Sequence, residues 1–232
     1  LVMSGAINQV ETDEYISTVK VTLDNDKPEF PKLSLSEGVY SFDGLEAGMY
    51  QLSAEKSDDY GNGVSTLDLI LIQKHILGLS ALDNTYDLIA ADANGNGAIS
   101  AADLFELRKL ILGVSTELAL GKSWRFIDRD YDFLNPMSPW SEMISAEEIE
   151  VLLSANSSSN NFFGIKVGDI NGSAIANLNA TTLENRSNET INLNIDNIDV
   201  QEGLIEVPVY AEDFNEVYGA QFTMKLRGLT YN

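Results

Sequence analysis

The stretch DANGNGAISAAD, residues 92–103, decides how this chain of 232 residues is interpreted. Counted as a twelve-position loop, it offers oxygen atoms at positions 1, 3, 5, 7 (the main-chain carbonyl), 9 and 12, which are Asp92, Asn94, Asn96, Ala98, Ser100 and Asp103. Gly97 stands at position 6, where a sharp turn needs a residue that tolerates a positive φ angle. A hard cation such as Ca²⁺ takes about six to eight oxygen ligands, and this spacing wraps the chain around one ion. A plain Asn-Gly turn explains the glycines but not the spaced carboxylates and amides, so we predict a calcium site.

A second copy of the loop end and its helix lies upstream. Residues 64–80, VSTLDLILIQKHILGLS, repeat residues 99–115, ISAADLFELRKLILGVS. In both copies a Ser is the expected N-cap, because its side chain can accept a hydrogen bond from the first helical turn, and an Asp follows three residues later. Both helices run out at a glycine suited to the C′ position, Gly78 and Gly113. The chain therefore carries a duplicated loop-plus-helix unit.

The first loop of the pair is less regular than the second. Counting back from the helix gives candidate calcium ligands at the same positions, namely Ser57, Asp59, Gly61, Gly63, Ser65 and Asp68. Ser57 and Gly61 are poor substitutes for carboxylates or amides, although Asp58 can shift in as a ligand. With fewer anionic ligands this site should be weaker than the second. A loop held only by side-chain turns is the alternative.

The duplication resembles the dockerin type I module over residues 57–115. The features that carry the resemblance are Asp at position 12, where EF-hands usually have Glu, and a basic residue in the middle of each helix, Lys74 and Lys109. The resemblance implies two units, each a loop followed by one helix, packed around two calcium ions and able to bind a cohesin-like protein. At positions 10 and 11 stand Thr66-Leu67 and Ala101-Ala102 in place of the Ser-Thr pair common in cellulosomal members. This departure favours a role within the chain, in which calcium sets the angle between domains.

Residues 1–56 contain alternating β-formers separated by Gly and Asp, which predicts strands. The segment EGVYSFDGLEAGMYQL, residues 37–52, resembles a hairpin of the carboxypeptidase regulatory-like or CNA-B-like β-sandwich. The expected fold is therefore multidomain: an all-β sandwich at 1–56, an α-helical pair of calcium loop-helix units at 57–115, an irregular extension at 116–175 packed on that pair, a linker at 176–190, and a partial β-sandwich at 191–232. The last part resembles the start of a cohesin-like domain.

The extension 116–175 is rich in aromatic residues. We expect them to form a satellite core against the helices, and the alternative is a sugar-binding platform that uses Trp124 and Trp140. The capping-box pattern at Ser145 predicts a short helix through Leu153. A third ion has two candidate places, Asp128–Asp132 and Asp169–Ser173. The second of these looks like the first half of a calcium loop and can contribute ligands to a shared site.

Composition limits the classes of function. The chain has 36 Asp and Glu against 14 Lys and Arg, a net charge of −22, so it should repel nucleic acid and anionic lipid. It has no cysteine, and its single histidine, His75, is expected to be a solvated helix residue. No apolar run reaches the length of a membrane span, so we expect no membrane insertion. The first residues lack the features of a signal peptide, which favours a mature chain or an internal fragment.

The order of the predicted parts resembles large secreted surface proteins of the Bacteroidetes. We expect a non-enzymatic, calcium-binding structural or interaction region of a secreted or surface-attached protein, because no nucleophile and base can be paired without Cys and with one His. Its expected partners are other domains of the same protein, a cohesin-like protein or cell-surface components. The alternative is a calcium-stabilised carbohydrate-binding accessory region of a secreted polysaccharide-degrading enzyme.

Overall fold

The structure is a computed structural model that describes residues 1–27, 32–177, 192–195 and 209–212. It contains two compact units, Leu1–Thr182 and Leu183–Asn232. In the second unit β9 (Asn192–Ile195) and β10 (Val209–Glu212) pair as antiparallel strands. The remainder of the predicted cohesin-like module and most of the predicted linker lie outside the described residues.

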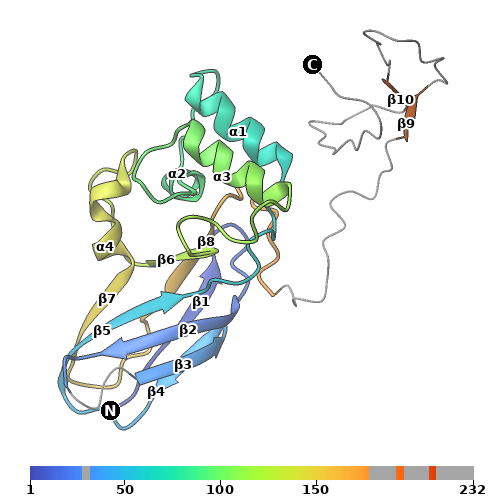
Figure 1. Ribbon diagram of the computed structural model, residues 1–232. Helices are drawn as coiled ribbons and strands as arrows, with labels where there is room; N and C mark the ends of the chain where they lie inside the picture. The colour runs from blue at the N-terminus through green and yellow to red at the C-terminus, as the bar shows by residue number, and fades with distance from the viewer. Residues whose placement is uncertain (28–31, 178–191, 196–208, 213–232) are drawn as a thin grey trace. The chain divides into compact units, whose positions relative to one another are not determined.

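The first unit is built on two four-stranded sheets (Figure 1). One sheet has the order β4-β1-β8-β6, formed by Val39–Phe42, Met3–Gln9, Phe162–Lys166 and Trp124–Asp128. The other has the order β3-β2-β5-β7, formed by Lys32–Glu37, Ser17–Asp24, Gly48–Glu55 and Glu148–Leu153. Side chains from both sheets enclose one apolar core, which includes Ile7, Val21, Leu52, Phe126 and Phe162. A strand places alternate side chains on opposite faces, and the burial of Val19, Val21 and Leu23 along β2 follows that period.

The extension 116–175 completes this sandwich and does more than pack on the helices. Strand β8 runs parallel to β1, while β7 runs antiparallel to β5. Without these strands, β1 and β5 would each present an unpaired row of backbone groups. The predicted boundaries at 56 and 115 are therefore corrected: residues 1–56 share their sheets with residues from 124 to 166, and the helical region is inserted between β5 and β6.

The prediction of a helix from Ser145 through Leu153 is wrong. A short 3₁₀ turn (Pro139–Glu142) and α4 (Met143–Ala146) come first, and residues Glu148–Leu153 then form strand β7. The local pattern resembled a capping box, but Ile149 and Val151 are β-branched and the open edge of β5 offers a full row of backbone partners. Tertiary pairing has overridden the local signal.

The duplicated helices form as predicted. Helix α1 (Thr66–Ile76) and helix α3 (Ala101–Ile111) begin with capping boxes at Ser65 and Ser100, each closed by the Asp three residues later. Gly78 and Gly113 follow the two helices with the same φ of 67°. One implication of the resemblance needs correction, since α2 (Thr85–Ala91) precedes the loop at 92–103.

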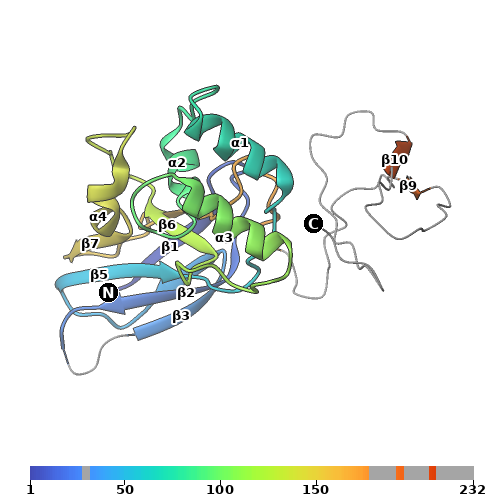
Figure 2. The same ribbon diagram turned by 45° about the horizontal axis from the view of Figure 1, so that its top comes forward.

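A second apolar core lies between the helices and the outer face of the β6–β8 sheet (Figure 2). In β6, Trp124 and Phe126 belong to the sandwich core, whereas Ile127 belongs to the helical core. Ile165 of β8 also packs with the helices, against a cluster that includes Ile72 and Leu107. Strands β6 and β8 are thus buried on both faces and position the loop at 92–103 relative to the sandwich.

Candidate metal centres

The loop from Asp92 to Asp103, called the intact loop below, connects the end of α2 to the start of α3. The two carboxylate oxygens of Asp92 accept hydrogen bonds from the main-chain N–H groups of Asn96 and Gly97, each at 3.0 Å. Gly95 and Gly97 have φ angles of 72° and 78°, a backbone region that favours glycine. The first carboxylate is therefore held at the centre of a tight turn.

The amide side chains and the last carboxylate close the loop into a ring. The Asn94 Oδ1 atom accepts from the N–H of Asn96 at 3.0 Å, and the Asn96 Oδ1 atom accepts from the N–H of Ala98 at 2.9 Å. Asp103 accepts from the N–H of Asn94 at 3.2 Å and from the N–H of Ser100 at 2.9 Å. All six residues predicted as calcium ligands are thus brought into one loop.

The electrostatics of the intact loop favour a cation. Asp92 is 1% exposed and Asp103 is 0% exposed. Burial raises the pKa of Asp103, and the nearby Asp92 charge raises it further, while hydrogen bonds from Ser100 and Asn94 lower it. Two carboxylates that share a buried site repel each other, and a divalent ion between them removes that repulsion.

The donor set of the intact loop suits calcium. Within the described ranges no group of three or more His, Cys, Asp or Glu residues converges on one point. The loop instead combines two carboxylates with amide, hydroxyl and carbonyl oxygens. Calcium accepts all of these oxygen types, whereas zinc prefers nitrogen and sulfur ligands.

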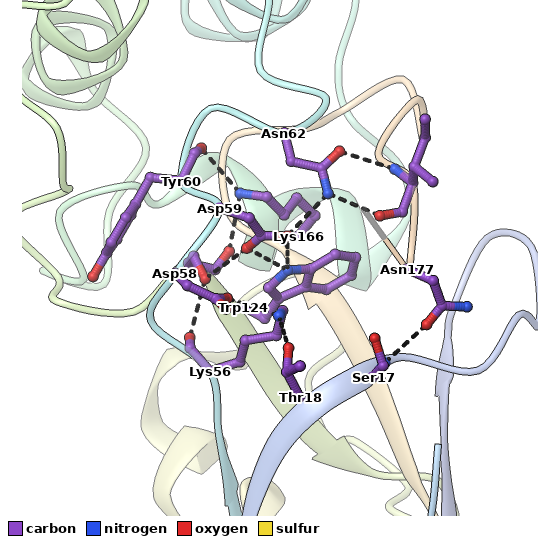
Figure 3. A network of polar contacts seen from close by, with 12 residues as sticks. Ser17, Thr18, Lys56, Asp58, Asp59, Tyr60, Asn62, Trp124, Lys166 and Asn177 are labelled. Carbon is purple, nitrogen blue, oxygen red and sulfur yellow. Dashed lines mark hydrogen bonds and ion pairs between the residues drawn. The ribbon is translucent and has the colours of Figure 1, made fainter. Parts of the chain in front are cut away.

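In the predicted loop at 57–68, the first half binds other side chains of the chain (Figure 3). Asp59 accepts hydrogen bonds from Trp124 Nε1 at 3.1 Å, from Ser123 Oγ at 3.2 Å and from Asn62 Nδ2 at 3.0 Å. Asp58 pairs with the Lys56 ammonium at 2.7 Å. Ser57 is exposed. The structure therefore corrects the first-loop set: Ser57, Asp59 and Gly61 lie in a stretch that ties β5 to β6, where Asn62, Ser123 and Trp124 donate to Asp59.

The network in Figure 3 holds this stretch in place through hydrogen bonds and an ion pair within the chain. The buried Lys166 ammonium donates to the carbonyls of Tyr60 and Ser123, at 3.1 and 3.2 Å. Asn62 donates to the Ile175 carbonyl at 2.9 Å and accepts from the Ile175 N–H at 3.0 Å. Residues 56–62 are thus fixed by contacts with β6 and with β8 and the segment that follows it.

The second half of that loop meets a distant segment. Asp68 accepts hydrogen bonds from the N–H groups of Ile170 at 2.8 Å and Asn171 at 3.3 Å. Ser173 Oγ donates to the Gly63 carbonyl at 3.1 Å. The Asp169–Ser173 candidate for a third ion is therefore not a separate place, because it lies against Gly63 and Asp68 of the first-loop set.

In the other candidate for a third ion, Asp128–Asp132, the carboxylates do not converge on one point. Asp128 accepts from the N–H of Asp130 at 3.0 Å, while the side chains of Asp130 and Asp132 are exposed. Among the described residues this segment is part of no cluster of potential metal ligands. The alternating Asp residues run from Asp128, the last residue of β6, into a surface turn.

The aromatic residues of the extension pack into cores. Trp124 is 0% exposed and Phe126 is also buried, both inside the sandwich. Tyr131, Phe133 and Trp140 are partly buried against the helical core, as the satellite-core prediction requires. Trp124 is consequently unavailable as a sugar-stacking platform.

Comparison with known proteins bears on the helical region alone. The family model described as the dockerin type I domain matches residues 61–112, which contain α1, α2, α3 and the intact loop. We found no match among curated proteins or solved structures. The regulatory-like and cohesin-like resemblances stay predictions. In the described part of the chain no helix is long and apolar enough to cross a membrane. Residues 61–112 are thus similar to the dockerin type I domain, a type of module that binds calcium and other proteins.

Proposed function

We propose that this chain is a non-enzymatic, calcium-binding structural and interaction region of a secreted or surface-attached multidomain protein. The observation that carries the proposal is the intact loop, which contains the candidate oxygen donors Asp92, Asn94, Asn96, Ala98, Ser100 and Asp103 and is closed by a hydrogen bond between Asn94 and Asp103. The dockerin type I match over the same residues supports calcium as the ion.

The position of the intact loop gives calcium a mechanical role. The N–H of Gly168, just after β8, donates to the carbonyl of Ala90 at the end of α2, at 2.8 Å. Helix α2 also contacts β8 directly. An ion that fixes the junction between α2 and α3 therefore fixes the helices on the sheet. Calcium would rigidify the arrangement of the helical region on the sandwich.

The duplicated helices also offer a surface for a protein partner. Equivalent residues after α1 and α3, Leu79 and Val114, are 74% and 73% exposed. The preceding equivalent pair, Leu77 and Leu112, is exposed as well. Single exposed apolar residues are common, but the same pattern in both copies marks two matching faces of one module. We propose that these faces dock a cohesin-like protein or another domain of the same protein.

The carbohydrate-binding alternative has less support, because Trp124 is buried and its ring nitrogen is used by Asp59. The chain's one histidine has a structural contact, since His75 Nδ1 accepts a hydrogen bond from the Leu82 N–H at 3.0 Å. Neither residue supports an assignment to sugar binding or catalysis.

Titration calorimetry with Ca²⁺ tests the proposal on the whole chain. Asp92→Asn should remove one calcium-binding event, because the amide keeps the shape of the side chain but not its charge. Asp132→Asn, an exposed carboxylate outside the loop, is the matched control and should bind as the unaltered chain does. Equal binding by Asp92→Asn and the unaltered chain would contradict the proposal.

A further inference from the structure

The residues around Asp169 reproduce the first half of the intact loop. The two Asp169 oxygens accept from the N–H groups of Ser173 at 3.1 Å and Ala174 at 2.7 Å, four and five residues later. Asp92 accepts from the residues four and five positions later in the same way. Asp169 therefore occupies the equivalent of position 1.

Position 3 is reproduced too. The Asn171 Oδ1 atom accepts from the N–H of Ser173 at 3.1 Å, as Asn94 accepts from Asn96. Gly172 has a φ of 66°, and Gly95 at the equivalent position 4 has a φ of 72°. Residues 169–172 thus reproduce the backbone and side-chain pattern of positions 1–4, and the N–H groups of Ser173 and Ala174 bind Asp169 as those of positions 5 and 6 bind Asp92.

Residues 63–68 reproduce the second half. Asp68 accepts from the N–H of Ser65 at 2.8 Å, as Asp103 accepts from Ser100. The bond that closes the ring is also present, because Asp68 accepts from the N–H of Asn171, 103 residues away, as Asp103 accepts from Asn94. These residues correspond to positions 7–12.

The two segments meet where an intact loop is continuous. A Cβ atom added to Gly63 would lie 2.7 Å from the nitrogen of Ala174, so the backbone at position 7 touches the backbone at position 6. Ser173 Oγ donates to the carbonyl of Gly63 at 3.1 Å. This close approach is independent of the side-chain pattern, and it aligns the halves without a chain connection.

We propose that residues 169–174 and 63–68 together form a second calcium site, called the assembled loop, in which a segment after β8 supplies positions 1–6 and the segment before α1 supplies positions 7–12. Its oxygen donors are Asp169, Asn171, Ser173, the Gly63 carbonyl, Ser65 and Asp68. The proposal rests on the proposed function, because it takes the ion from the intact loop that the assembled loop copies.

The burial of the carboxylates supports a bound ion. Asp68 is 0% exposed and Asp169 is 3% exposed. Burial is the largest cause that raises the pKa of each, and the Asp68 charge raises that of Asp169 further. The Lys166 charge acts in the opposite direction on Asp169, but its ammonium donates to the carbonyls of Tyr60 and Ser123. A divalent ion compensates both carboxylates at once.

The assembled loop would connect three parts of the first unit that are far apart in the sequence. Gln9 of β1 donates to the Ala174 carbonyl at 3.2 Å, and Asn62 holds Ile175 by two hydrogen bonds. The ion would therefore join the end of β8 to the start of α1, close to the first strand of the sandwich. Calcium would link the entry of the inserted helical region to the segment that follows β8.

Calcium stoichiometry of the whole chain, measured by calorimetry, tests the assembled loop. We expect two ions for the unaltered chain and one for Asp169→Asn, Asp68→Asn and the double variant, because the two residues share one ion. Asp59→Asn is the matched control and should keep two. A loss of an ion in Asp59→Asn but not in Asp169→Asn would overturn the proposal in favour of a continuous loop at 57–68.

The remaining outcomes separate this proposal from the proposed function. If Asp92→Asn loses one ion and Asp169→Asn loses none, the intact loop binds and the assembled loop does not. If Asp169→Asn loses one ion and Asp92→Asn loses none, the assembled loop stands and the intact loop fails. Circular dichroism in chelator checks that each variant keeps the fold, and Ser173→Ala, which removes one uncharged donor, should weaken only the assembled site by about tenfold.

Discussion

The intact loop and the assembled loop share the hydrogen bonds of positions 1, 3 and 12 but differ in the length of chain between their halves. The intact loop closes within twelve residues, from Asp92 to Asp103. The assembled loop closes between residues 103 apart. Closing a flexible chain over the longer separation costs about 2 kcal/mol more, because the entropy cost grows with the logarithm of length.

This difference teaches what each ion would stabilise. The intact loop can form whenever α2 and α3 are close, so its ion acts on a local unit. The assembled loop exists only when β8 is paired in the sheet and α1 has docked, so its ion stabilises the whole fold. The same ligand chemistry thus has a local effect in one region and a global effect in the other.

Removal of calcium should have the largest effect, because it tests both loops at once. A ligand that binds only the folded state at about 100 times its Kd adds about 2.7 kcal/mol per site, so two sites add about 5 kcal/mol. For a unit of this size, chelation should lower Tm by about 10–20 °C, measured by calorimetry. Magnesium at equal concentration is the control, since it demands a smaller, stricter geometry and should restore little. An unchanged Tm on chelation would contradict both sites.

Asp169→Asn and Asp92→Asn should separate global from local stabilisation. In calcium, each should lose about 2–3 kcal/mol of binding free energy, but from different parts of the molecule. Hydrogen exchange should rise throughout both sheets in Asp169→Asn, whereas in Asp92→Asn it should rise mainly in α2 and α3. Identical exchange patterns in the two variants would remove the distinction between the loops.

Gly63→Ala should damage the assembled loop alone. The added Cβ would meet Ala174 at 2.7 Å, and the φ of 73° disfavours a side chain, so we expect a loss of about 2–3 kcal/mol in chemical denaturation. Gly78→Ala is the matched control, because its φ is 67° but nothing lies within 4 Å. It should lose only about 1 kcal/mol, the cost of a side chain in the left-handed region. Equal losses in the two variants would mean that contact between the halves contributes nothing.

Residue spacing within one short segment predicted the intact loop, whereas the assembled loop depends on contacts between segments far apart in the sequence. All ligands of the intact loop fall in one twelve-residue window, so spacing alone identifies Asp92 and Asp103. The Asp169–Ser173 half was recognisable in the same way. Gly63, Ser65 and Asp68 were also predicted as ligands, but of a continuous loop at 57–68, because nothing in the sequence states that Gly63 meets Ala174; that contact depends on the pairing of β8 with β1.

The same limit explains the errors in the fold. The pattern at Ser145 predicted a helix from local residues, while the open edge of β5 made residues Glu148–Leu153 a strand. Trp124 was a candidate for sugar binding because aromatic residues serve equally in cores and platforms, and only the tertiary structure placed it inside the sandwich. Capping at Ser65 and Ser100 depended on neighbouring residues and was predicted correctly.

The pH dependence of the calcium-free protein should give the smallest effect. Burial raises the pKa of Asp68, Asp103 and Asp169. A raised pKa means that the folded state binds more protons than the unfolded state, so stability falls as pH rises from the unfolded value near 4 through the folded values. In chelator, acidification from pH 7 towards pH 5 should therefore raise Tm, an effect that the net charge of −22 reinforces.

The two loops can be separated in that experiment by variants that cannot titrate. Asp169→Asn should reduce the pH dependence in chelator, because its neutral amide resembles the protonated acid, and Asp92→Asn should reduce it less, since it removes only a neighbouring charge from Asp103. In calcium the slope should reverse, because acid then protonates the ligands and releases the ions. Asp132→Asn controls for net charge. A Tm in chelator that falls steadily from pH 7 to pH 5 would contradict the raised pKa of the buried carboxylates in the calcium-free protein.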